Sequence, residues 1–203
     1  MVLELLVVVI ALALALGLRP WRLLKGSQLL TPLLATLVLL PWLWALPALH
    51  GMPLQLQWSG ACLVLLMLGW PLAVPVLCLS AVLAALISPM PWSEVPDLAA
   101  WLGVVPATLA LGVGAAVRRL GTHPFIYLLG RAFLGSAVCL FAAGVLRQLV
   151  GHAPAGVSPE LTVIAHWLTA WGDAVVTGML TAIFVAYRPQ WLATWSDTLY
   201  LHR

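Results

Sequence analysis

Charged side chains are scarce in this sequence. Only 7% of its 203 residues are Asp, Glu, Lys or Arg, whereas 64% are hydrophobic. Soluble domains carry roughly 25% charged residues, so a soluble fold of this composition would expose an apolar surface to water. Lipid is the solvent that fits, and helices cross lipid because they satisfy their own backbone hydrogen bonds. We therefore predict an all-α, polytopic membrane protein that is one transmembrane domain over residues 1–203.

The usual signatures of catalysis and redox chemistry are missing as well. The three cysteines are isolated in apolar runs and form no CxxC pair, which argues against a thiolate metal site or a redox pair. No Walker A, GxSxG or HExxH motif occurs, so we expect no enzyme that works alone, and we assign no cofactor. The net charge of +3 comes from basic residues between apolar runs, which is typical of membrane topology and indicates no nucleic-acid partner.

Long apolar runs are what the chain has in abundance. At roughly 20 residues per crossing, they predict about seven membrane spans. The expected bounds are 2–18, 28–49, 58–87 (divided into two), 98–117, 124–149 and 161–187. Pro32, Pro41 and Pro47 lie inside the second span, where they predict kinks or an early end of the helix.

The distribution of basic residues decides how the 58–87 run is read. It could form one long helix, or a hairpin interrupted by the Gly-Trp-Pro sequence at 69–71. With the hairpin, Arg19 and Arg118 fall on the same side of the membrane, as the positive-inside rule requires. We therefore predict about seven spans, with the N-terminus outside and the C-terminus in the cytoplasm, in a bacterial inner membrane. Arg147 then falls on the outer side, against the rule.

Polar groups inside membrane spans are costly and therefore informative. Asp173 lies midway along the last apolar run, and His166 precedes it by seven residues, so the two share roughly one helix face. This pattern is consistent with a proton or cation site. The structural alternative is a buried tie between helices, from Asp173 to Arg131 or Arg147.

Two further polar residues lie near the expected outer end of the second span. His50 ends that span, and Gln57 follows seven residues later. Nitrogen and oxygen donors that converge can hold a metal ion or a polar solute, although a lone interfacial His is often simply solvated. The predicted substrate-binding set is His50, Gln57, His166 and Asp173, with the nature of any metal unknown.

Small residues on the first span predict a close helix contact. Ala11 and Ala15 form an AxxxA pair, which lets a second helix approach closely. That helix could belong to the same bundle or to another subunit. We therefore name Ala11 and Ala15 as candidate partner-binding residues.

Three segments carry a resemblance to a known family. They are 18–24 (LRPWRLL), 60–73 (GACLVLLMLGWPLA) and 178–201, which contains Tyr-Arg-Pro-x-Trp and Asp-x-Leu-Tyr-Leu. In order and spacing they resemble the bacterial energy-coupling-factor transporter permeases, distant relatives of the cobalt/nickel-capturing membrane subunits. The resemblance implies a seven-span permease or substrate-capture subunit for a transition-metal ion or a small cofactor. It further implies two partners, a coupling membrane subunit and an ATPase.

The resemblance also bears on single residues. Asp173 stands at the acidic position that precedes the family's last Gly-x-Leu-Thr-like stretch, whereas Gln57 stands where the family has a His. The family's amino-terminal His donor is absent from the opening Met-Val-Leu-Glu. The alternative function is an accessory integral membrane protein that binds and stabilises or assembles another membrane complex. Such a protein would have no polar cavity and would pair Asp173 with Arg131 or Arg147.

Overall fold

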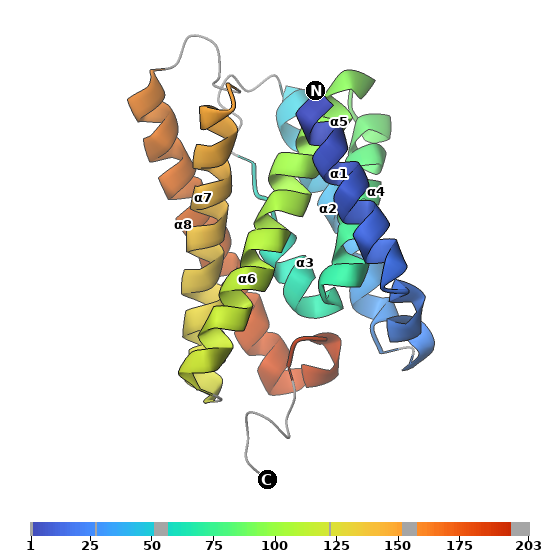
Figure 1. Ribbon diagram of the computed structural model, residues 1–203, viewed down its shortest axis with the longest axis vertical. Coiled ribbons are helices and arrows are strands. Elements are labelled where there is room, and N and C mark those ends of the chain that lie inside the picture. Colours follow the sequence, from blue (N-terminus) through green and yellow to red (C-terminus); the bar gives the residue numbers. More distant parts are fainter. Residues whose placement is uncertain (1, 27, 51–56, 122, 152–157, 196–203) are drawn as a thin grey trace.

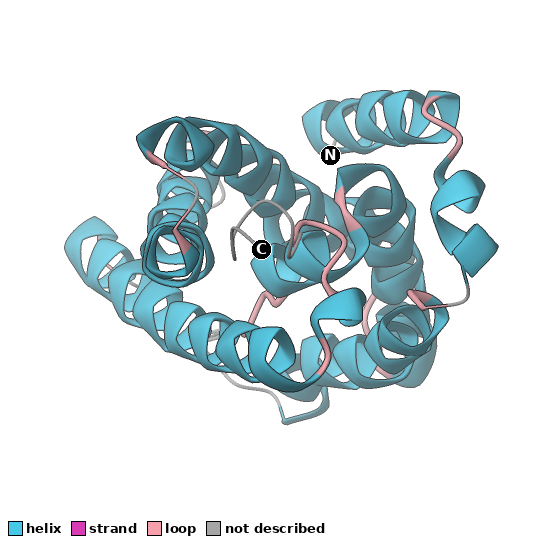
Figure 2. Cartoon of the chain, turned by 90° about the horizontal axis from the view of Figure 1, so that it is seen from below, coloured by secondary structure: helices cyan, strands magenta, loops and turns pink. Residues whose placement is uncertain are grey.

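The computed structural model describes residues 2–26, 28–50, 57–121, 123–151 and 158–195, and over these ranges the chain forms helices and loops without a strand (Figure 2). The α-helices are α1 (Val2–Gly17), α2 (Leu30–His50), α3 (Ala61–Leu68), α4 (Trp70–Ile87), α5 (Val95–Leu98), α6 (Val105–Leu120), α7 (Gly135–Leu149) and α8 (Pro159–Tyr187). The connecting helical segments are η1 (Pro20–Gly26), η2 (Trp92–Glu94), η3 (Ala99–Val104), η4 (Ile126–Leu134) and η5 (Pro189–Trp191).

The helices form one bundle whose long members run along a common direction. Figure 1 shows α7 and α8 on one flank, α1, α2 and α4 on the other, and α3 and α6 between them. Contacts of α6 with α7, and of α3 with both α6 and α8, join the two flanks. The start of α1 and the η2–α5 turn lie at one end of the bundle, whereas η5 lies at the other (Figure 1).

Length and composition indicate a membrane protein. Within the described ranges, five helical segments are long and apolar enough to cross a membrane: Leu30–Leu49, Trp70–Ile87, Trp92–Leu120, Ile126–Leu149 and Pro159–Tyr187. Helix α1 is also apolar but has 16 residues. Many large apolar side chains on these helices are exposed, as expected for surfaces that face lipid. The all-helical bundle is therefore confirmed over the described residues, and five segments are suited to crossing a membrane. The count of seven spans and the orientation of the termini stay predictions.

The predicted break in the 58–87 run is confirmed, and its cause is Gly69. The backbone at Gly69 has φ 74° and ψ 156°, a conformation that side chains disfavour and that ends α3 before α4 begins. Of the two effects predicted for the prolines of the second span, the early end of the helix is wrong, whereas the kink stays a prediction. Helix α2 continues through Pro41 and Pro47 to His50, so it does not stop early.

Helix α3 is too short to cross a membrane by itself. Its 8 residues are all buried, and at 1.5 Å per residue they cover about 12 Å of a hydrocarbon core of about 30 Å. Residues 57–60, which precede it, are not helical. Irregular backbone of this kind is tolerated inside a membrane bundle only where protein groups or a cavity satisfy its polar atoms.

The segment that follows α8 satisfies the last carbonyls of α3. The Ala193 N–H donates to the Met67 carbonyl over 2.9 Å, and the Thr194 hydroxyl donates to the Leu66 carbonyl, also over 2.9 Å. The Tyr127 hydroxyl lies 2.8 Å from the Thr194 hydroxyl. Because the final carbonyls of a helix have no partner within it, this hook of residues 189–195 stabilises the end of α3.

Candidate functional site

The beginning of α3 is held by a carboxylate from the middle of α8. The Ser59 and Gly60 backbone N–H groups donate to one oxygen of Asp173, over 2.8 and 3.0 Å. The Thr177 hydroxyl donates to the other oxygen over 3.1 Å. Asp173 is buried, and it does from another helix what an N-cap side chain does locally, since it satisfies N–H groups at a helix start.

The non-helical segment before α3 is fixed on two further sides. The Ser59 hydroxyl donates to the Leu102 carbonyl of η3 over 2.6 Å, and the Trp44 indole N–H donates to the Ser59 carbonyl over 3.1 Å. Pro106 lies four residues after Leu102 and has no N–H, so the usual α-helical donor for that carbonyl is missing. The segment 57–60 is therefore tied to α2, η3 and α8 together.

A small polar cavity lies beside this segment, between η3, α7 and α8. Its volume is about 70 Å³, and its polar lining includes Gln57, Ser59, Arg147, His166, Thr169 and Asp173. We call it the inner chamber. The His166 ring is half-buried there because α7 has a glycine opposite it: a Cβ on Gly144 would lie 2.7 Å from His166 Cγ.

A larger cavity adjoins the inner chamber on the side of α5. This vestibule has a volume of about 420 Å³, and its lining includes Trp44, Met90, Ser93, Glu94 and Asp97. Glu94 is exposed at the end of the bundle where α5 lies (Figure 1), so the vestibule reaches the surface there. Gln57, Leu102 and Arg147 line both cavities, so these three side chains form the partition between them.

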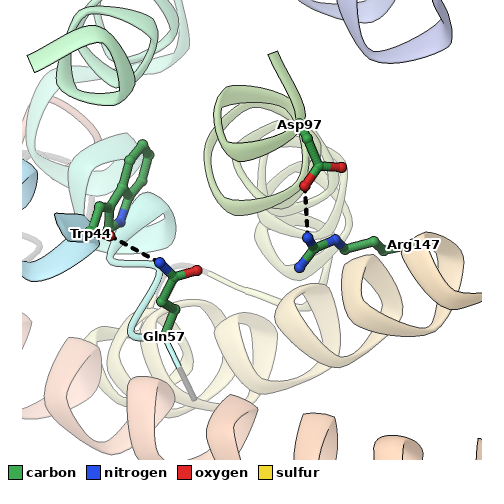
Figure 3. A network of polar contacts seen from close by, with 4 residues as sticks. All are labelled: Trp44, Gln57, Asp97 and Arg147. Carbon is green, nitrogen blue, oxygen red and sulfur yellow. Dashed lines mark hydrogen bonds and ion pairs between the residues drawn. The ribbon is translucent and has the colours of Figure 1, made fainter. Parts of the chain in front are cut away.

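The polar tips of two partition residues are anchored (Figure 3). Arg147 Nη2 lies 2.6 Å from Asp97 Oδ2, in an ion pair between α7 and α5. Gln57 Nε2 donates to the Trp44 carbonyl over 2.9 Å. In the predicted topology Arg147 is the basic residue that departs from the positive-inside rule, and the ion pair would account for this because Asp97 neutralises its charge.

The predicted tie from Asp173 to an arginine is wrong. Arg147 pairs with Asp97, while Arg131 lies against Gly114 and over the Tyr127 ring, with its Cζ 5.8 Å from the ring centre. The physical reason is that the Ser59 and Gly60 backbone N–H groups donate hydrogen bonds to Asp173. These bonds stabilise the buried carboxylate in place of a cation.

Three of the four predicted substrate-binding residues come together. Gln57, His166 and Asp173 line the inner chamber. His50 ends α2, and its side chain lies outside what the structure describes. Seven residues of helix separate His166 from Asp173, which is about 10 Å along the axis. The two side chains therefore line one wall of the chamber instead of holding a single ion between them.

A ready-made metal site is not visible in the described part of the chain. Over those ranges no three His, Cys, Asp or Glu side chains converge. The donors that do converge on the inner chamber are an amide, hydroxyls, an imidazole and a carboxylate. Such groups form hydrogen bonds with a polar solute, or complete the shell of a partly hydrated ion.

Comparison of the chain with family models, curated proteins and solved structures finds no match. Membership in the energy-coupling-factor permease family is therefore a proposal, and its support comes from the geometry of the site.

Ala11 and Ala15 contact other helices of the same chain. Their exposed fractions are 8% and 0%, and they pack against Val74 of α4 and Val104 of η3. Of the two contacts predicted for this AxxxA face, the structure shows the one within the bundle. A contact with another subunit at these residues stays a prediction.

Asp97 and Arg147 are site residues that the sequence analysis missed. The sequence did contain a signal for them, because Arg147 was the basic residue that departed from the positive-inside rule in the predicted topology. A basic residue on the outer side calls for a nearby acid, and Asp97 lies in the acidic loop at that end. The bond from Ser59 to Asp173 carried no such signal, since it is made by the Ser59 backbone N–H.

Proposed function

We propose that this protein is the substrate-capture, or permease, subunit of an energy-coupling-factor type transporter. The observation that carries the proposal is the pair of adjoining polar cavities, which extend from exposed Glu94 to buried Asp173. Ionisable side chains inside membrane bundles are markers of solute and ion pathways and of proton relays. The accessory-protein alternative predicts that no such cavity exists.

The two volumes restrict the solute. The vestibule, at about 420 Å³, falls within the range of roughly 300–1,000 Å³ that small-molecule sites occupy. The inner chamber, at about 70 Å³, has space for a few waters or one ion. A small cofactor would therefore lie in the vestibule and extend a polar group inward, whereas a metal ion could reach the chamber itself.

The broken third crossing also supports a capture role. Transport proteins often bind solutes near the middle of the membrane, where a discontinuous helix begins. Helix α3 begins beside Asp173, midway along α8, and the chamber lies beside that start. Since the sequence has no ATP-binding motif, energy would come from an ATPase partner through a coupling membrane subunit.

For the topology we propose seven crossings in a bacterial inner membrane. The third would consist of the 57–60 segment and α3 together, since α3 by itself is too short. The N-terminus would lie outside with the Glu94 end of the vestibule, and the C-terminus in the cytoplasm. In support, α1 begins at the bundle end opposite η5 (Figure 1), so the number of crossings between them is odd.

Solute binding by the purified protein tests this function. The detergent-solubilised protein is titrated with cobalt, nickel, copper and zinc ions and with a panel of small water-soluble cofactors, by calorimetry. We expect one class to bind, and His166→Ala to weaken that binding at least tenfold. His123→Ala is the matched control, because His123 is exposed and lines neither cavity. Absence of binding by every probe, together with no ATPase in a native-membrane pull-down, would refute the capture function.

The accessory function keeps one observation in its favour. Both oxygens of Asp173 are engaged in bonds that hold the fold together, so a structural role explains this residue without a solute. If the pull-down recovers a membrane complex that lacks an ATPase, and no probe binds, the accessory function becomes the better proposal.

A further inference from the structure

We propose that the Asp97–Arg147 ion pair, together with Gln57, is a gate that closes the inner chamber to the vestibule. The inference rests on the proposed capture function and adds to it the step that controls access. Neither the fold nor the capture proposal requires a barrier at this position, so the gate can fail while capture stands.

The position of Arg147 is the first argument. Its side chain lines both cavities, whereas Asp97 lines only the vestibule and His166 and Asp173 line only the chamber. A solute that passes from Glu94 to Asp173 must therefore pass Arg147. The ion pair draws the guanidinium toward Asp97 of α5 (Figure 3). In the gate proposed here, this position keeps it at the boundary between the two cavities.

The geometry and exposure of the Asp97–Arg147 ion pair make it easy to break. Only Nη2 of the guanidinium reaches Asp97, and Arg147 Nε is buried without a hydrogen-bond partner among the described residues. A bidentate arginine–carboxylate pair would be stronger and geometrically more fixed. The side chains are 25% and 22% exposed, so water in the vestibule competes for both charges and weakens the pair.

Opening needs only side-chain motion. Arg147 lies in the last turn of α7 and Asp97 in the short α5, and the long arginine side chain can rotate while both helices stay in place. Gln57, the second polar part of the partition, is held at its tip by the Trp44 carbonyl. A charged solute in the vestibule competes with the Asp97–Arg147 bond, so its arrival shifts the gate toward the open arrangement.

Cysteine accessibility measures the gate directly. In a background with Cys62, Cys78 and Cys139 replaced by alanine, Thr169→Cys places a thiol in the inner chamber, and Ser93→Cys places one in the vestibule. The probe is a small, neutral methanethiosulfonate reagent, so the charge of the gate does not itself steer the reagent. Modification rates are compared in the parent protein, in Asp97→Asn and in Arg147→Gln.

We expect Asp97→Asn and Arg147→Gln each to raise the rate at Thr169→Cys roughly two- to fivefold, the order expected for loss of one partly exposed ion pair. The rate at Ser93→Cys should not change, because that thiol lies on the vestibule side of the gate. An unchanged thermal unfolding midpoint shows that the variants are folded. The double exchange Asp97→Arg with Arg147→Asp restores the pair with its charges reversed and should return the chamber rate to a low value.

Other outcomes would overturn the gate. If Thr169→Cys reacts at the same rate in all variants, and as fast as Ser93→Cys, the passage is open and no gate exists, while capture is unaffected. If Thr169→Cys reacts in none of them, vestibule and chamber do not connect. The gate then fails, and the capture proposal loses the continuous cavity that supports it.

Discussion

At the scale of single residues, Asp173 joins α8 to the segment before α3. Its carboxylate accepts hydrogen bonds from the Ser59 and Gly60 backbone N–H groups and from the Thr177 hydroxyl. Without the carboxylate, the two N–H groups would be buried without a partner. Asp173→Ala should therefore lower the free energy of unfolding by about 3 kcal/mol, since hydrogen bonds to a charged group contribute roughly 1.5–3 kcal/mol each and buried orphans are costly. Thermal unfolding in detergent measures the loss.

A matched variant separates the contribution of the Asp173 carboxylate to stability from that of the Thr177 hydroxyl. Thr177→Val removes only the hydroxyl bond to Asp173, at 3.1 Å, and should cost about 1 kcal/mol. If Asp173→Ala were no less stable than Thr177→Val, the carboxylate would not hold the start of α3 in the membrane protein as it does here.

At the scale of secondary-structure elements, the eight-residue helix α3 is stabilised from outside at both ends. Asp173 of α8 holds its beginning, and the hook of residues 189–195 holds its end. Thr194→Val removes the hydroxyl that donates to the Leu66 carbonyl and contacts Tyr127. We expect the end of α3 to fray, with hydrogen–deuterium exchange over residues 61–68 faster by roughly five- to tenfold, because about 1 kcal/mol of local stability is lost.

The control for this variant is Thr36→Val. The Thr36 hydroxyl bonds within its own helix, to the Pro32 carbonyl, so its removal should leave exchange in α3 unchanged. Equal exchange over 61–68 in Thr194→Val and the parent protein would show that the hook does not support α3.

The elements also show how far the sequence could be read. The break at Gly69 was predictable, because glycine and proline punctuate an apolar run wherever they occur. The shortness of α3 was not, since hydropathy counts apolar side chains and does not register that residues 57–60 are non-helical. The partner of Asp173 was unpredictable for a related reason: it is a pair of backbone N–H groups, which every residue except proline carries.

At the scale of the whole molecule, the two ends of the bundle should lie on opposite sides of the membrane. Ser93 is exposed at the vestibule end, and Gln190 is exposed on η5 at the other end. In the alanine background, Ser93→Cys in intact cells should react with a membrane-impermeant maleimide, whereas Gln190→Cys should react only after the membrane is permeabilised. The positive-inside rule supplies the direction, because exposed Arg118 and Arg119 end α6.

A third thiol decides whether the third crossing exists. Arg22 is exposed on η1, before α2, whereas Ser93 follows α4. If the 57–60 segment and α3 together pass through the bilayer, three crossings separate Arg22→Cys from Ser93→Cys, and the two thiols differ in access. If α3 instead returned the chain to the side on which α2 ends, two crossings would separate them, and they would react alike. Protection of both thiols in intact cells would leave the vestibule on the cytoplasmic side, so orientation and capture from outside would fail together.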